Sequence, residues 1–220
     1  MNLISHIRIA NQTLKSIDDK IDCKVYKPVY LLGSIAPDLN VAFPKHTIRL
    51  TINRWKRRLR RVDKTSSDLV KSFMLGVIIH YICDYFCYVH NIRSHGLKHK
   101  IYEIYLARHI KMQSSYMEFD NEELIGTWDT LIHQIESNNK CSLIPKELDI
   151  IGLINIEIDA IDKITDVIIQ MNKIYKQETI NNTNQKYKDI QNQNQLGLDL
   201  KYAKFISTQI ALIFLSSTGL

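Results

Sequence analysis

Histidine and carboxylate residues recur in the first half of the chain at spacings that suit metal binding. His80 and Asp84 lie four residues apart, and His99 and Glu103 repeat that spacing. On a helix, this spacing places both side chains on one face, one turn apart. His90 lies between the two pairs. Imidazole nitrogens and carboxylate oxygens are suitable zinc ligands, so the two pairs can line one metal-binding cleft.

A single histidine–carboxylate pair is also common on solvated helix faces, where it binds no metal. Asp84 differs from such a residue because it stands inside the strongly apolar run from Phe73 to Phe86. A carboxylate buried there without a partner would be costly. Asp129 and His133 have the same spacing, but no second pair lies near them in the sequence. We therefore interpret Asp129 and His133 as a solvated or structural pair.

The composition predicts an all-α fold. The 220 residues are 45% hydrophobic and include only 7 Gly and 4 Pro, too few turn formers for a many-stranded sheet. We expect a single domain over residues 1–220, folded as a multi-helix bundle. Its central helix begins at Ser66 or Ser67, carries His80 and Asp84, and has His90 near its end.

Further apolar stripes predict the remaining helices. A first helix begins at Ser5 as its cap, another runs from Leu97 to Met117, and an amphipathic helix ends the chain. The segment from Gly33 to Asp38 is expected to form a turn, and residues 181–195 a loop or weak helix.

The net charge of the chain indicates its possible partners, and its N-terminal stretch and cysteines indicate its location in the cell. A net charge of +6 suits anionic partners, namely nucleic acid, a phospholipid surface or a phosphorylated substrate. The basic run from Arg54 to Arg61 contains one aromatic residue, Trp55, so we interpret it as a solvated connector and not as a base-stacking surface. Polar residues interrupt the N-terminal apolar stretch, and the four cysteines are scattered. We therefore expect a cytoplasmic protein with free thiols.

The run from Phe73 to Asn91 resembles the core signature of the zinc-dependent phospholipase C family. That signature is H-x3-D-x5-H with a glycine one turn before the first histidine, and H-x3-E follows it. His80, Asp84 and His90 match the first part, and His99 and Glu103 match the second. The family also has an upstream Pro-Asp segment, a histidine after it, and a histidine on the first helix. Pro37-Asp38, His46 and His6 match these features in order.

The resemblance implies the all-helical fold of the phospholipase C and P1 nuclease type, and three metal positions. The ligands implied for the first zinc are Asp38, His46, His80 and Asp84. Those implied for the second are His90, His99 and Glu103. His6 would hold a third zinc, which Asp84 would bridge to the first. Asp38 is in addition a candidate general base.

The secreted enzymes of the family complete their third site with the terminal amine and carbonyl of a tryptophan. This chain begins Met1-Asn2 instead. Two arrangements therefore stay open, a site with two zinc ions and a site with three that the Met1 amine completes.

The activity implied by the resemblance is zinc-dependent hydrolysis of a phosphate ester, as in a phospholipase C-like phosphodiesterase. The substrate would be a phospholipid, on an anionic membrane surface, or a smaller phosphate ester. Two alternatives stay open: a zinc nuclease or nucleotidase of the related branch, and a non-catalytic metal-binding protein.

Overall fold

The computed structural model describes residues 1–18, 24–39, 53–54, 56–57, 66–92, 96–113, 122–139, 158–184 and 193–218. All regular structure in these residues is helical, which confirms the predicted all-α class. The helices are α1 (Leu3–Asp18), α2 (Lys27–Leu39), α4 (Asp68–Tyr85), α5 (Tyr88–Asn91), α6 (Leu97–Gln113), α7 (Glu122–Asn139), α8 (Ile158–Asn184) and α9 (Gln193–Thr218). None of these helices is long and apolar enough to cross a membrane. That residues 1–220 form one domain stays a prediction.

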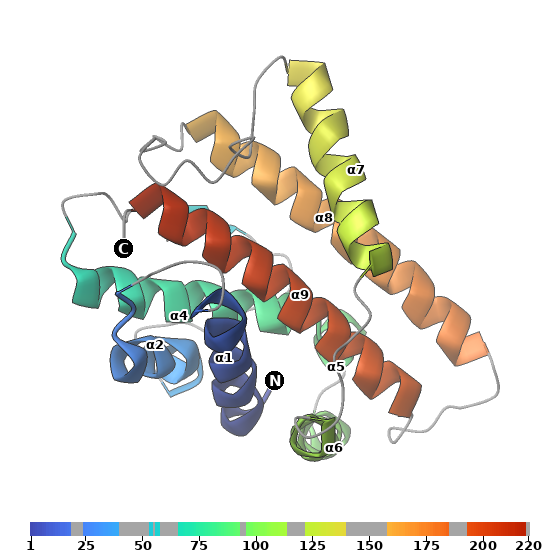
Figure 1. Ribbon diagram of the computed structural model, residues 1–220. Coiled ribbons are helices and arrows are strands. Elements are labelled where there is room, and N and C mark those ends of the chain that lie inside the picture. Colours follow the sequence, from blue (N-terminus) through green and yellow to red (C-terminus); the bar gives the residue numbers. More distant parts are fainter. Residues whose placement is uncertain are drawn as a thin grey trace.

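Helix α4 is the central helix that the apolar run predicts. Ser67 caps it, since the Ser67 side chain accepts a hydrogen bond from the backbone N–H of Val70. Helix α9 packs against α4, α1, α6 and α8 (Figure 1). Because neighbours cover α4 on several sides, nearly all of its residues from Lys71 onward are buried. A helix with no polar face is stable only in such surroundings.

The prediction that His90 lies near the end of the central helix was wrong. Helix α4 ends at Tyr85, and His90 lies on the separate short helix α5. Phe86 and Cys87, which separate α4 from α5, have backbone angles that are not helical. Periodicity did not reveal this break because the sequence stays apolar across it.

The prediction of a turn from Gly33 to Asp38 was also wrong, because these residues belong to α2. Helix α2 packs along α4, and Gly33 and Gly76 lie where the two backbones meet. A Cβ atom on Gly76 would lie 2.0 Å from the carbonyl oxygen of Tyr30. Here glycine therefore allows close packing and does not mark a turn. Pro37 stands inside the helix although it cannot donate a backbone hydrogen bond.

The start of the first helix differs from the prediction, whereas the helical parts of residues 181–195 agree with one of the two predicted alternatives. Helix α1 begins at Leu3, and the side chain of Asn2 accepts a hydrogen bond from the N–H of Ser5. Asn2, and not Ser5, is therefore the N-cap. Helix α8 continues to Asn184, and α9 begins at Gln193, so parts of the Asn/Gln-rich segment are helical.

A buried carboxylate on α9 joins several helices. Asp199 is fully buried, and it accepts hydrogen bonds from the backbone N–H of Tyr88, the hydroxyls of Tyr102 and Tyr175, and the amide of Gln195. Burial raises the pKa of Asp199 from 3.8 to about 6, although these four donors favour the charged form and oppose the rise.

This raised pKa predicts a pH-dependent effect of the substitution Asp199→Asn. Between about pH 4 and pH 6 the folded protein holds a proton that the unfolded chain has released, so the stability contributed by Asp199 falls as the pH rises. The free energy of unfolding of the wild type, minus that of Asp199→Asn, should fall by up to about 3 kcal/mol over this window. Urea denaturation of both chelator-treated proteins measures it. A difference that grows with pH would contradict the raised pKa.

Candidate metal centre

Five helices bring the predicted ligands together in two groups. The first group consists of His6 on α1, Asp38 on α2 and His80 on α4. The second group consists of His90 on α5 with His99 and Glu103 on α6. Within each group, one possible ligand atom per residue lies within 4.8 Å of the others. Asp84 lies between the groups, and His46 lies outside the described residues.

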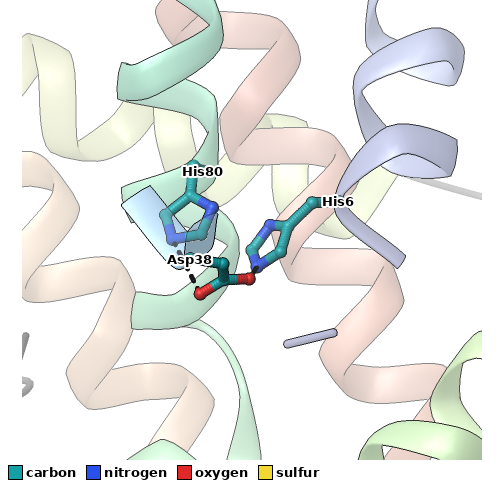
Figure 2. Close-up of side chains that lie close together, drawn as sticks. All are labelled: His6, Asp38 and His80. Atoms are coloured by element: carbon teal, nitrogen blue, oxygen red, sulfur yellow. Dashed lines mark ion pairs between the residues drawn. The ribbon is translucent and has the colours of Figure 1, made fainter. Parts of the chain in front are cut away.

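In the first group, the carboxylate of Asp38 lies against the edges of two imidazole rings (Figure 2). Its Oδ2 is 3.6 Å from Nε2 of His6, and its Oδ1 is 3.8 Å from Nε2 of His80. The two rings stack with their centroids 3.9 Å apart. Both Nε2 atoms therefore face the same carboxylate, as ligands of a shared ion must.

The orientation of His80 leaves Nε2 available for a metal. Its Nδ1 lies 2.9 Å from the backbone carbonyl oxygen of Ser34 on α2. A carbonyl only accepts hydrogen bonds, so Nδ1 carries the proton and Nε2 carries the lone pair. Metal-binding histidines are commonly oriented in this way.

The side chain of His6 supports the same interpretation. It is fully buried, and neither of its ring nitrogens forms a hydrogen bond. A buried polar atom without a hydrogen bond is costly in a folded protein. Nε2 of His6 faces the carboxylates of Asp38 and Asp84, so a cation placed there would satisfy all three side chains.

Asp84 connects the two groups. Its Oδ2 lies 3.5 Å from Nε2 of His80, and its Oδ1 lies 3.3 Å from Nε2 of His6 and 3.6 Å from Nε2 of His90. Oδ1 also pairs with the terminal amine of Met1. The side chain is only 2% exposed, so this carboxylate is buried among basic groups, as the cost of burying it alone requires.

All three side chains of the second group are partly exposed, between 14% and 22%. Nε2 of His99 lies 2.9 Å from Oε1 of Glu103, and Nε2 of His90 lies 3.6 Å from the same oxygen. Burial lowers the pKa of His90, against the opposing charge of Asp84. Burial alone would raise the pKa of Glu103, but its interaction with His90 and the positive charge of the terminus lower it to about 2. Near neutral pH, a neutral His90 and an ionised Glu103 are the forms that bind zinc.

The N-terminus enters the centre between the two groups. The Met1 amine is buried, lies 2.9 Å from Nε2 of His90 and 3.3 Å from Oε1 of Glu103, and pairs with Asp84. Burial alone would lower its pKa, but the charges of Asp84 and Glu103 raise it well above the usual value. Asn2 anchors this segment, because its amide donates to the carbonyl oxygen of Glu103.

The resemblance implies a third zinc held by His6. In the structure, His6 lies in one group with Asp38 and His80. Asp84 lies close to both His6 and the Met1 amine. The number of metal ions stays a prediction.

The donor set fits zinc. Both groups combine imidazole nitrogens with carboxylate oxygens, the ligand types that zinc uses at catalytic sites. His133, which has the same spacing from Asp129, is exposed on α7 and belongs to neither group.

Three residues around the centre were missed in the sequence. Ser34 contributes its backbone carbonyl, which no side-chain pattern reveals. Asn2 could have been found, because an asparagine directly before an apolar stripe is a common helix cap. Asp199 could also have been found, because it is the only carboxylate in the mostly apolar segment from Leu196 to Ala203.

One comparison with known proteins gave a match. The sequence model described as zinc dependent phospholipase C matches residues 5–164, well over half of the chain. This range contains the positions of all eight predicted ligands. Neither the curated proteins nor the solved structures gave a match. The order of the ligands, the helical fold and the extent of this match agree, and the chain belongs to the zinc-dependent phospholipase C family.

Proposed function

We propose that this protein hydrolyses a phosphate ester with two or three zinc ions bound by His6, Asp38, His46, His80, Asp84, His90, His99 and Glu103. The observation that carries the proposal is the pair of ligand groups joined by Asp84. Zinc bound there would neutralise phosphate oxygens, acidify a water molecule and stabilise the leaving oxygen.

Within this proposal, Asp38 is the general base that takes the proton of the attacking water. Its side chain is 26% exposed, more than that of any other described ligand, while the histidines beside it are fully buried. A carboxylate at the solvent-facing side of the group can contact both water and substrate. Asp84 is buried, so it would act as a ligand that balances charge between the two groups and not as a base.

The family favours a phospholipid over a nucleotide as the substrate, because the matching sequence model describes a phospholipase C. The phosphate would then be attached to an apolar body, on an anionic membrane surface or as a single molecule.

We predict that Asp38→Asn lowers the turnover of zinc-loaded protein by about 100-fold or more, because the amide keeps the shape of the side chain but cannot accept the proton. Release of p-nitrophenol from bis(p-nitrophenyl) phosphate, with zinc content measured on the same samples, tests this. Asp166→Asn is the matched control, because Asp166 is exposed on α8, which contributes no ligand. Equal rates for wild type and Asp38→Asn at equal zinc content would exclude Asp38 as the base.

A parallel substrate screen separates the remaining alternatives. Hydrolysis of a short-chain phospholipid in preference to an oligonucleotide or nucleotide supports the phospholipase interpretation. The reverse preference supports the nuclease or nucleotidase interpretation. Zinc-loaded protein that hydrolyses none of these substrates would be a non-catalytic metal-binding protein.

A further inference from the structure

The break between α4 and α5 determines how the two ligand groups face each other. Asp84 lies one residue before the end of α4, and His90 lies on α5, which begins at Tyr88. Backbone groups at helix ends lack partners within their own helix. Cys87, which precedes α5, provides no side-chain hydrogen bond as a cap. The Asn91 amide on α5 supplies local partners, because it donates to the carbonyl oxygens of Tyr85 and Cys87. Further partners at this junction come from other parts of the chain.

Two buried side chains from the C-terminal helices supply those partners. The amide of Asn172 on α8 donates to the carbonyl oxygen of Tyr85 at 2.8 Å. Oδ2 of Asp199 on α9 accepts from the backbone N–H of Tyr88, also at 2.8 Å. Asn172 is 2% exposed and Asp199 is fully buried. Both lie beyond residue 164, where the family match ends.

The same oxygen of Asp199 also holds α6. The hydroxyl of Tyr102 donates to Oδ2 at 2.8 Å, and Tyr102 directly precedes Glu103. One carboxylate oxygen thus contacts α5 two residues before His90 and α6 one residue before Glu103. These two helices carry every ligand of the second group.

The other oxygen of Asp199 faces away from the centre. Oδ1 accepts from the hydroxyl of Tyr175 on α8 and from the amide of Gln195 on α9, both at 2.7 Å. Neither Tyr175 nor Gln195 lies on a helix that contributes a ligand. The carboxylate therefore has one oxygen directed to the ligand-bearing helices and one anchored in the C-terminal helices.

We propose that Asp199 is a positioning residue that sets the spacing of His90, His99 and Glu103 by holding α5 and α6 through a single oxygen. This rests on the proposed function, in which that group binds zinc. Burying a carboxylate is costly even when it is fully hydrogen-bonded, so fold stability alone gives little reason for one here. Its substitution should weaken the second metal selectively, whereas a purely structural residue would affect both metals or neither.

The experiment compares Tyr102→Phe, Tyr175→Phe and Asp199→Asn. Each tyrosine variant removes one hydroxyl from a buried ring that donates to Asp199, but only Tyr102 contacts the oxygen that faces the ligands. Zinc affinity is measured in competition with a chromophoric chelator, which resolves the two binding steps. The absorption spectrum of the cobalt-substituted protein reports on ligand geometry, and melting temperatures report on folding.

We expect Tyr102→Phe and Asp199→Asn to weaken one of the two binding steps by about 10-fold, as substitutions next to metal ligands commonly do. The other step should be unchanged, and the cobalt spectrum should change. Tyr175→Phe should leave both steps and the spectrum unchanged, whatever its melting temperature. If Asp199→Asn does not fold, the comparison of zinc affinity between Tyr102→Phe and Tyr175→Phe tests the inference.

Two results would overturn the inference. Wild-type protein that binds two zinc ions, with equal affinities in Tyr102→Phe and Tyr175→Phe, would overturn it and leave the proposed function standing. Wild-type protein that binds no zinc would overturn both.

Discussion

Replacing His80 by alanine is expected to remove the metal of the first group and with it most of the hydrolysis. His80 is fully buried, and its Nδ1–H donates to the carbonyl of Ser34, which leaves Nε2 directed at the carboxylates of Asp38 and Asp84. Zinc content should fall by one ion per chain. Turnover should fall by at least about 100-fold, since even substitutions next to a metal ligand lower metal affinity or activity by about 10- to 100-fold.

His80→Ala should also lower stability in the presence of zinc. A metal ion at about 1,000 times its Kd stabilises the folded state by about 4 kcal/mol. Elemental analysis and thermal unfolding, with zinc and with chelator, measure both effects. His133→Ala is the control, because His133 is exposed on α7. A stability difference between wild type and His80→Ala that is as large with chelator as with zinc would show that His80 only supports the fold.

Gly76→Ala is expected to be the most destabilising single-methyl change in the described part of the chain. The added Cβ would lie 2.0 Å from the carbonyl oxygen of Tyr30 and 2.7 Å from the backbone nitrogen of Ser34. Both are backbone atoms of α2, so the helices must move apart. Overpacking commonly costs about 1–3 kcal/mol, and we expect at least about 3 kcal/mol here because no flexible side chain can yield. The same movement separates Asp38 on α2 from His80 on α4.

Urea denaturation of Gly76→Ala and Gly126→Ala tests this expectation. Gly126 lies on α7 with no atom within 4 Å of an added Cβ, so Gly126→Ala should raise stability by up to about 1 kcal/mol. Loss of the first metal in Gly76→Ala would connect the helix crossing to the site. A stability of Gly76→Ala equal to that of wild type would contradict the tight α2–α4 contact.

The sequence predicted α4 well because its signals are local. Ser67 caps the helix as expected, and the apolar run after it is buried. The spacing of His80 and Asp84, and of His99 and Glu103, became two pairs of neighbouring side chains because helix geometry places residues four apart on one face.

The sequence misled where a residue type has two uses. Gly33 and Pro37 commonly mark turns, yet both lie inside α2. Gly33 is needed because the backbone of α4 approaches it, and that approach is invisible in a local window. The break at Phe86 and Cys87 was missed for a similar reason, because two of its partners, Asn172 and Asp199, lie more than 80 residues away.

By itself, the sequence determined the types and order of the proposed ligands. It also determined their pairing within helices, since that pairing follows from the 3.6-residue repeat of the α-helix. Only the tertiary structure decided that His6 stacks on His80, that the Met1 amine lies beside Asp84, and that Asp199 contacts α5 and α6. Those contacts join helices far apart in the chain. They depend on how the faces of these helices pack, and that packing is determined jointly by the side chains of all the helices involved.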